Sequence, residues 1–254
     1  MSTRRYRMLL AYDGTAYAGW QVQPRHRTVQ GELERVLEQL TGRPVRVEAS
    51  GRTDSGVHAR GQVAHFDLTD MVIDPDRLQV GLNALLDPDI RVAAVKPTPS
   101  TFHARFSAKG KEYRYFIHND PVVPPFDQRY RTHIRQPLDA AAMQQAAGWL
   151  VGRHDFAAFA ANPNREIDGT VRTVYRLSVS RKGPLLTLRA CGDGFLYKMV
   201  RSLAGYLIRV GAGEVAPEAA RATLESRVRT ARVPTAAPEG LFLWRVYYHR
   251  PPAP

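Results

Sequence analysis

Hydrophobic and polar residues in the first 100 positions follow two periods, one typical of strands and one typical of helices. Alternation with a period of two predicts strands over residues 5–13, 45–50, 61–68 and 90–96. Apolar residues recur at helical spacing behind Thr28, which is a good helix N-cap, and behind Asp74, which precedes a proline. The predicted order is strand, helix, strand, strand, helix, strand.

The remainder of the chain repeats this order. Strands are predicted over residues 112–118, 174–181, 185–191 and 241–249, with helices over 138–150 and 195–210 and a short helix from Pro217. Two successive βαββαβ units are typical of two ferredoxin-like halves. The predicted fold class is therefore α+β, with two antiparallel sheets side by side and an active-site cleft between the halves.

The predicted boundary between the halves lies in residues 96–110, which are rich in proline, serine and threonine. This division assigns residues 1–100 to an N-terminal half and residues 101–254 to a C-terminal half. The segments 161–170 and 250–254 are expected to be irregular because of their composition.

Charge adds information about the partner. The net charge is +12, and 31 of the 36 basic residues are arginine. A GC-rich genome would explain arginine in place of lysine, but it would not explain the excess of positive charge. Arginine binds phosphate and stacks on bases, so the composition favours a nucleic-acid partner.

Other features of the composition restrict the class of protein. The sequence has no apolar run long enough to span a bilayer, and its first residues do not resemble a signal peptide, so we expect a cytoplasmic protein without membrane contact. Cys191 is the only cysteine, which excludes an internal disulfide and a cysteine-based structural zinc site.

The segment GRTDSG at residues 51–56 connects two predicted strands and carries a candidate catalytic carboxylate. Its two glycines allow unusual backbone angles, and Arg52, His58 and Arg60 gather around Asp54 in the sequence. An Asp-Ser-Gly string is also a common turn. From these residues alone, Asp54 is either a turn residue or a functional carboxylate.

The predicted helix 195–210 offers a partner for that carboxylate. Arg201 lies at the edge of its apolar face, where a partly buried guanidinium needs an anion, although edge arginines also extend to solvent. An arginine facing Asp54 would keep the carboxylate ionised. Tyr113 and Tyr115 share one face of their strand and serve either as core residues or as a platform for a base.

Several cofactor motifs are absent from the sequence. It contains no Walker loop, no dinucleotide glycine fingerprint and no HExxH motif, and the histidines show no metal-ligand spacing. These absences leave a cofactor-free enzyme or a binding protein.

Six segments, in this order, resemble the tRNA pseudouridine synthase A family. They are LAYDGTAYAGWQVQP, ASGRTDSGVHARGQVAHFD, LNALLDPDIRV, FHARFSAKGKEYRYFI, GDGFLYKMVRSLAG and APEGLFLWRVYY. The resemblance reaches from the N-terminus to about residue 249 and implies two ferredoxin-like halves with the active site between them. It also implies a homodimeric isomerase without metal or cofactor, which converts uridines 38, 39 and 40 of the tRNA anticodon stem-loop to pseudouridine by base flipping.

The resemblance also implies roles for individual residues. Asp54 matches the catalytic aspartate, Tyr113 the tyrosine that packs on the target base, and Arg201 the basic residue paired with the aspartate. Arg52 matches the arginine beside the target nucleotide. The residues that precede Met-Val-Arg in FLYKMVR vary within the family, and no catalytic position is missing.

Two other functions fit parts of the sequence. A non-catalytic tRNA-binding or chaperone protein on the same fold would keep the basic surface and tolerate Asp54→Asn. A nucleic-acid hydrolase would use Asp54 differently, but the sequence lacks clustered acidic metal ligands.

Overall fold

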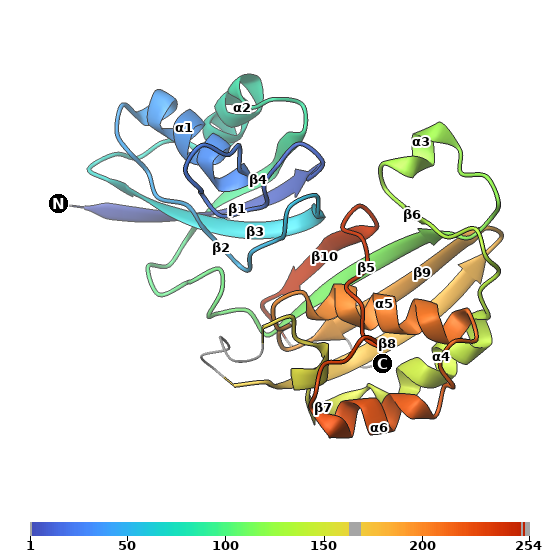
Figure 1. Cartoon of the computed structure of the whole chain (residues 1–254). Coiled ribbons are helices and arrows are strands. Elements are labelled where there is room, and N and C mark those ends of the chain that lie inside the picture. Colours follow the sequence, from blue (N-terminus) through green and yellow to red (C-terminus); the bar gives the residue numbers. More distant parts are fainter. Residues whose placement is uncertain (1, 163–168, 250, 252–254) are drawn as a thin grey trace. The chain divides into compact units, whose positions relative to one another are not determined.

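A computed structural model describes residues 2–162, 169–249 and 251, and it divides into two compact units. Unit 1 comprises residues 1–109 together with 242–250, and unit 2 comprises residues 110–241 with 251–254. Both units are mixtures of helices and mostly antiparallel strands (Figure 1). No helix within the described ranges is long and apolar enough to cross a membrane.

Unit 1 is built on a sheet in the order β4-β1-β3-β10, with β2 also paired to β3. Its elements are β1 (Thr3–Tyr12), α1 (Val29–Thr41), β2 (Glu48–Ala49), β3 (His58–Thr69), α2 (Pro75–Leu85), β4 (Ile90–Thr98) and β10 (Leu241–Tyr247). β1 runs antiparallel to both β3 and β4, whereas β10 runs parallel to β3. The predicted strand-helix order of the first 100 residues is confirmed in this unit.

Local sequence accounts for the two helices of unit 1. Thr28 caps α1 by accepting a hydrogen bond from the Gly31 amide, and the helix ends at Gly42, which has a left-handed φ of 69°. Asp74 caps α2 ahead of the proline that begins it. The apolar stripe of α1 is buried, as its spacing predicts.

The strands of unit 2 follow the order β5-β9-β8-β7, with β6 parallel to β5. Its strands are β5 (Gly110–His118), β6 (Thr132–His133), β7 (Gly152–Asp155), β8 (Val171–Lys182) and β9 (Leu185–Gly192). Its helices are α3 (Pro125–Gln128), α4 (Ala140–Trp149), η1 (Ala157–Phe159), α5 (Met199–Gly211) and α6 (Ala219–Ser226). The core lies between the sheet and helices α4 and α5, where the inward side chains of β5, β8 and β9 are buried.

Several boundaries differ from the prediction. The helix expected from residue 195 begins at Met199, because Lys198 adopts a left-handed conformation with φ of 58° and ends a preceding loop. The strand expected over 45–50 is reduced to the two residues of β2, and α3, β6, β7 and η1 are not predicted. The expected irregular segments 161–170 and 250–254 lie for the most part outside the described residues.

Candidate active site

The loop that carries Asp54 lies between β2 and β3 in unit 1. Asp54 is half-buried, and its carbonyl accepts a hydrogen bond from the Val57 amide at 3.1 Å. Gly56 has a left-handed φ of 76°, so the predicted unusual backbone of this loop is confirmed. Arg52 is exposed two residues earlier in the same loop. The structure thus places a partly shielded carboxylate and an exposed cation on one short connection.

A second loop, residues 13–20, packs against the Asp54 loop. The Trp20 amide donates to the Thr53 carbonyl at 3.0 Å, and the Gly56 amide donates to the Tyr17 carbonyl at 3.3 Å. A Cβ added to Gly19, whose φ is 97°, would lie 2.6 Å from the Thr53 carbonyl oxygen. Only glycine allows the two backbones to come this close.

The 13–20 loop is itself anchored. The Tyr17 hydroxyl donates to Asp89, and Arg27 pairs with both Asp87 and Asp89. The Arg27 guanidinium also lies 4.4 Å from the centre of the Tyr17 ring. Burial together with the hydrogen bond to Asp89 raises the pKa of Tyr17, so this phenol stays protonated as a donor.

Tyr113 and Arg201 both belong to unit 2. Tyr113 lies on β5 with only 8% of its surface exposed, and its ring meets that of Phe195 edge to face at 5.3 Å. Arg201, on α5, is partly buried, and its Nε donates to the Ala236 carbonyl at 2.7 Å. The expectation that Arg201 stays partly buried is confirmed, and the carbonyl fixes the orientation of its guanidinium.

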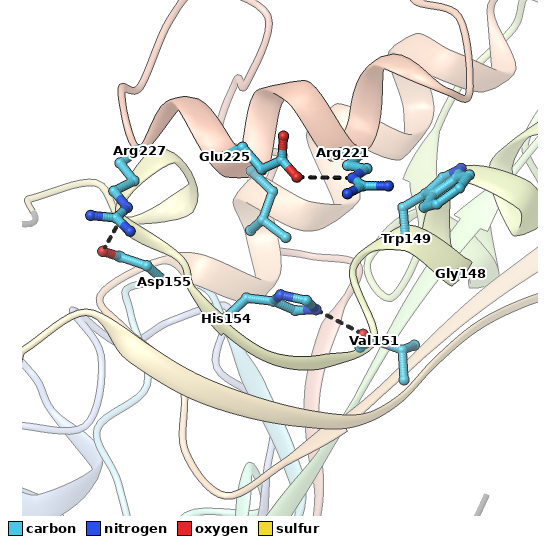
Figure 2. A pocket seen from close by; sticks show the side chains of 9 residues that line it. Gly148, Trp149, Val151, His154, Asp155, Arg221, Glu225 and Arg227 are labelled. Carbon is cyan, nitrogen blue, oxygen red and sulfur yellow. Dashed lines mark hydrogen bonds and ion pairs between the residues drawn. The ribbon is translucent and has the colours of Figure 1, made fainter.

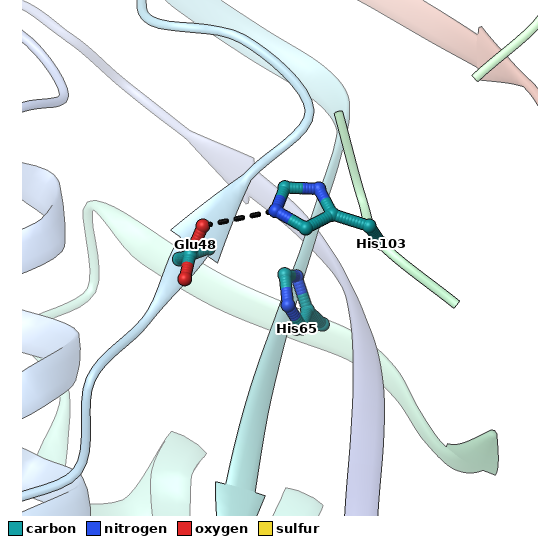
Figure 3. Close-up of side chains that lie close together, drawn as sticks. All are labelled: Glu48, His65 and His103. Atoms are coloured by element: carbon teal, nitrogen blue, oxygen red, sulfur yellow. Dashed lines mark hydrogen bonds and ion pairs between the residues drawn. The ribbon is translucent and has the colours of Figure 1, made fainter. Parts of the chain in front are cut away.

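One group of side chains in unit 1 has the composition of a metal site. Glu48, His65 and His103 bring one ligand atom each to within 4.8 Å of one another. The three side chains are drawn in Figure 3. The two histidines are far apart in sequence, so motif spacing does not reveal them. Nε2 of His103 lies 3.1 Å from the Glu48 carboxylate.

The hydrogen bonds of this cluster disfavour a metal ion. Nδ1 of His65 accepts from the Ala104 amide, and Nδ1 of His103 accepts from the amides of Arg105 and Phe106. A neutral ring that accepts at Nδ1 carries its proton on Nε2, whereas a ring that ligates through Nε2 usually donates from Nδ1. Burial is the main cause that lowers the pKa of His65, which favours this neutral form. The cluster fits a histidine–carboxylate hydrogen bond better than a metal centre.

A pocket in unit 2 lies at the end of α4, beside β7 and α6 (Figure 2). Its charged lining residues form ion pairs: Arg221 with Glu225 at 2.8 Å and Arg227 with Asp155 at 3.4 Å. Trp149, which is 42% exposed, also lines it. The two positive charges are balanced by two negative ones, so the pocket offers little attraction to a polyanion.

Comparison with known proteins identifies the family. A family model described as tRNA pseudouridine synthase matches residues 8–107 and 146–249. The tRNA pseudouridine synthase A of Brevibacillus brevis is 47% identical over 245 residues, covering 96% of this chain and 100% of that protein. The chain belongs to the tRNA pseudouridine synthase A family.

Other members give the same result. The tRNA pseudouridine synthase A of Geobacillus sp. (strain WCH70) is 44% identical over 247 residues, which is 97% of this chain and 99% of that protein. The corresponding protein of Listeria innocua is 42% identical over 247 residues, with 96% and 99% covered. An archaeal box H/ACA sRNP Nop10-Cbf5 complex matches 80% of this chain and 43% of that chain at 16% identity, but the TM-score of 0.32 is too low to inform the fold.

The contacts around the Asp54 loop include residues that motif reading does not single out in this tRNA pseudouridine synthase. Tyr12 and Gln62 are buried on β1 and β3, respectively, and their polar atoms reach residues 51–53. Both residues fall within or beside the segments that match the family. In the sequence, each is a residue with a polar group at a strand position that faces the core. Strand alternation alone assigns such a position to the core and gives no reason to expect a functional role.

Proposed function

We propose that this tRNA pseudouridine synthase isomerises uridines 38, 39 and 40 of the tRNA anticodon stem-loop, with Asp54 as its catalytic residue. The observation that carries the proposal is the match to synthase A relatives over 96% of the chain, with Asp54 on a loop fixed from two sides. An enzyme needs its reactive group held in place, and an ordinary surface turn does not need a second loop packed against it.

The reaction exchanges bonds within one nucleotide. The bond between N1 and C1′ breaks, the base turns, and a bond forms between C5 and C1′, while the hydrogen of C5 is replaced by one on N1. The mass of the RNA is unchanged and no energy input is required. Because a stacked base is out of reach, it must first leave the stack, at a cost of a few kcal/mol.

Asp54 begins the reaction, either by attacking the nucleotide as a nucleophile or by removing a proton from the sugar. Both routes require the carboxylate to be ionised. Arg201 keeps it so by supplying positive charge, and the Ala236 carbonyl that orients its Nε supports this role. Arg52, which is exposed, occupies the space left by the flipped base or holds a phosphate.

Tyr113 holds the detached uracil and takes part in removing the C5 proton. Its edge-to-face contact with Phe195 fixes the ring, which supports a role as a rigid platform for the base. Asp54 and Arg52 come from the N-terminal half, residues 1–100, and Tyr113 and Arg201 from the C-terminal half, residues 101–254. All four act on the same uridine.

We further propose that each half is ferredoxin-like. The order β4-β1-β3-β2 in unit 1, with α1 and α2 between its strands, supports this for the N-terminal half. The enzyme works in the cytoplasm as a homodimer and needs no cofactor. Its substrate is tRNA, whose phosphates suit the net charge of +12.

The test is to measure pseudouridine in the anticodon arm of unmodified tRNA by chemical labelling and reverse-transcription stops. Wild-type protein should produce stops and Asp54→Ala should produce none. Asp76→Ala is the matched control, because Asp76 is an exposed carboxylate of the same unit on α2. Tight tRNA binding without stops from any of the three proteins would instead indicate a binding protein, and a change in RNA length would indicate a hydrolase.

A further inference from the structure

Four polar side chains lie almost completely buried behind the loop that carries Asp54. They are Tyr12, Ser50, Thr53 and Gln62, with 4%, 0%, 7% and 0% of their surface exposed, respectively. Burying a polar group costs free energy unless its hydrogen bonds are replaced. Apolar side chains would fill the same space without that cost, which indicates that the polar atoms hold neighbouring residues in place.

Gln62, on β3, ties two consecutive residues of the chain that leads to Asp54. Its Oε1 accepts from the Ser50 hydroxyl at 2.7 Å and from the Val63 amide at 3.2 Å. Its Nε2 donates to the Gly51 carbonyl at 2.8 Å. Because the Val63 amide only donates and the Gly51 carbonyl only accepts, these backbone groups fix which way the side-chain amide points.

Tyr12, on β1, holds the residue directly before Asp54. Its hydroxyl lies 2.8 Å from Thr53 Oγ1 and 3.5 Å from Gln62 Nε2. Burial is the main cause that raises the pKa of Tyr12 to about 12, so the phenol keeps its proton near neutral pH. Gln62 Nε2 donates to this oxygen, and in the shorter contact either the phenol or the Thr53 hydroxyl can be the donor. The Trp20 amide meanwhile holds the Thr53 carbonyl from the other side.

We propose that Tyr12 and Gln62 are positioning residues for the reaction: side chains of two sheet strands that fix residues 50–53 and thereby the position of the Asp54 carboxylate. The inference rests on the proposed catalytic role of Asp54. Neither side chain touches the substrate, since both are buried. Their effect is on geometry, and a displacement of about 1 Å in a reacting group can cost about 100-fold in rate.

The main test is Tyr12→Phe, which removes one oxygen and keeps the ring. We expect kcat for pseudouridine formation to fall about tenfold, while KM and tRNA affinity stay within about twofold, because the geometry of the catalytic group changes and the RNA-binding surface does not. Gln62→Leu, which removes all the amide's hydrogen bonds, should lower kcat further if the protein still folds.

Tyr6→Phe is the matched control for lost stability. Tyr6 lies on the same strand, is 0% exposed, and donates its hydroxyl to the Ile73 carbonyl at 2.9 Å, away from the Asp54 loop. It should lose a similar amount of thermal stability and keep kcat within about twofold. If Tyr12→Phe and Tyr6→Phe have the same kcat, the positioning role is wrong.

A double-mutant cycle tests the contact itself. Thr53→Val removes the partner hydroxyl, so its effect on kcat should overlap with that of Tyr12→Phe, and the double variant should be no slower than the slower single variant. If the fold-losses in kcat of the two single variants multiply in the double variant, the Tyr12–Thr53 contact does not carry the positioning role. The proposed function fails separately, through an active Asp54→Ala variant or an inactive wild type, and the positioning role would fall with it.

Discussion

The Asp54 loop in unit 1 and the pocket beside α6 in unit 2 differ in how their polar groups are held. Buried hydroxyl and amide groups on two strands hold the residues that lead into the Asp54 loop. In the pocket, by contrast, arginines and carboxylates pair with one another at the surface, with the Arg221 and Glu225 side chains 65% and 63% exposed.

This difference teaches that burial of polar groups is a better guide to function here than the presence of a pocket. Exposed ion pairs contribute little to stability and form wherever long charged side chains meet. Buried polar networks are costly unless every member is satisfied, so one that holds the residues directly before a half-buried carboxylate supports a role in positioning it. The comparison predicts that changes at the loop and at its catalytic partners affect turnover, whereas changes at the pocket do not.

The largest expected effect is a difference in turnover between alanine variants of two arginines, Arg201 on α5 and Arg221 on α6. Arg201→Ala should lower turnover by about 100-fold or more and leave tRNA affinity nearly unchanged, if its fixed positive charge has the proposed role of keeping Asp54 ionised. Arg221→Ala, in the pocket, should keep turnover within about twofold. Single-turnover kinetics and a filter-binding assay check both. Equal losses of affinity and turnover in Arg201→Ala would show a phosphate contact instead.

A smaller difference in kcat is expected between alanine variants of Gly19 and Gly42, two glycines of unit 1 with positive φ. Gly19→Ala adds a Cβ that meets the Thr53 carbonyl at 2.6 Å, whereas Gly42→Ala, at the end of α1, meets nothing within 4 Å. Gly42→Ala should lose about 1 kcal/mol of stability to backbone strain, and Gly19→Ala should lose more, because its Cβ also meets a backbone oxygen. Only Gly19→Ala should also lower kcat, about tenfold, by displacing the Asp54 loop. Equal kcat values for two folded variants would show that the loop tolerates displacement.

The smallest effect concerns the pocket alone. Arg227 ends α6 with a left-handed φ of 56°, a position that favours glycine. Arg227→Gly should change the free energy of unfolding by at most about 1 kcal/mol, because relief of strain offsets the loss of the exposed ion pair with Asp155. Urea denaturation measures this, and kcat should remain that of wild type. A clear loss of turnover would mean that the pocket contributes to the reaction.

The sequence predicts the helices and strands of unit 1 because each signal there is local. Thr28 and Asp74 act through hydrogen bonds to amides two or three residues away, and the alternation along β1 reflects one buried face. The start of α5 is not predicted correctly. Residues 195–198 have the apolar spacing of a helix, but the left-handed conformation of Lys198 keeps them outside it, and that spacing does not reveal the conformation. The two-residue β6 is also beyond such reasoning, because its only signal is a long-range pairing with β5.

At the candidate site, the local sequence predicts the Asp54 loop but not the buried side chains that hold it. The glycines of GRTDSG indicate unusual backbone, and family resemblance identifies Asp54 as the candidate. Tyr12 and Gln62 could not be assigned in this way, because their partners lie 41 and 11 residues away along the chain. Only the folded sheet shows that an inward tyrosine and an inward glutamine meet the same loop.

The return of β10 to unit 1 has a consequence for biosynthesis. Residues 58–59 of β3, directly after the Asp54 loop, pair with Phe242 and Leu243, and the His58 ring stacks on that of Phe242 at 4.6 Å. During translation one edge of β3 at residues 58–59 therefore stays unpaired until residues 110–241 of unit 2 have been synthesised and β10 has followed them. A nascent chain stalled before residue 242 would carry Asp54 without the strand beside it, and it would have an exposed edge open to wrong pairing.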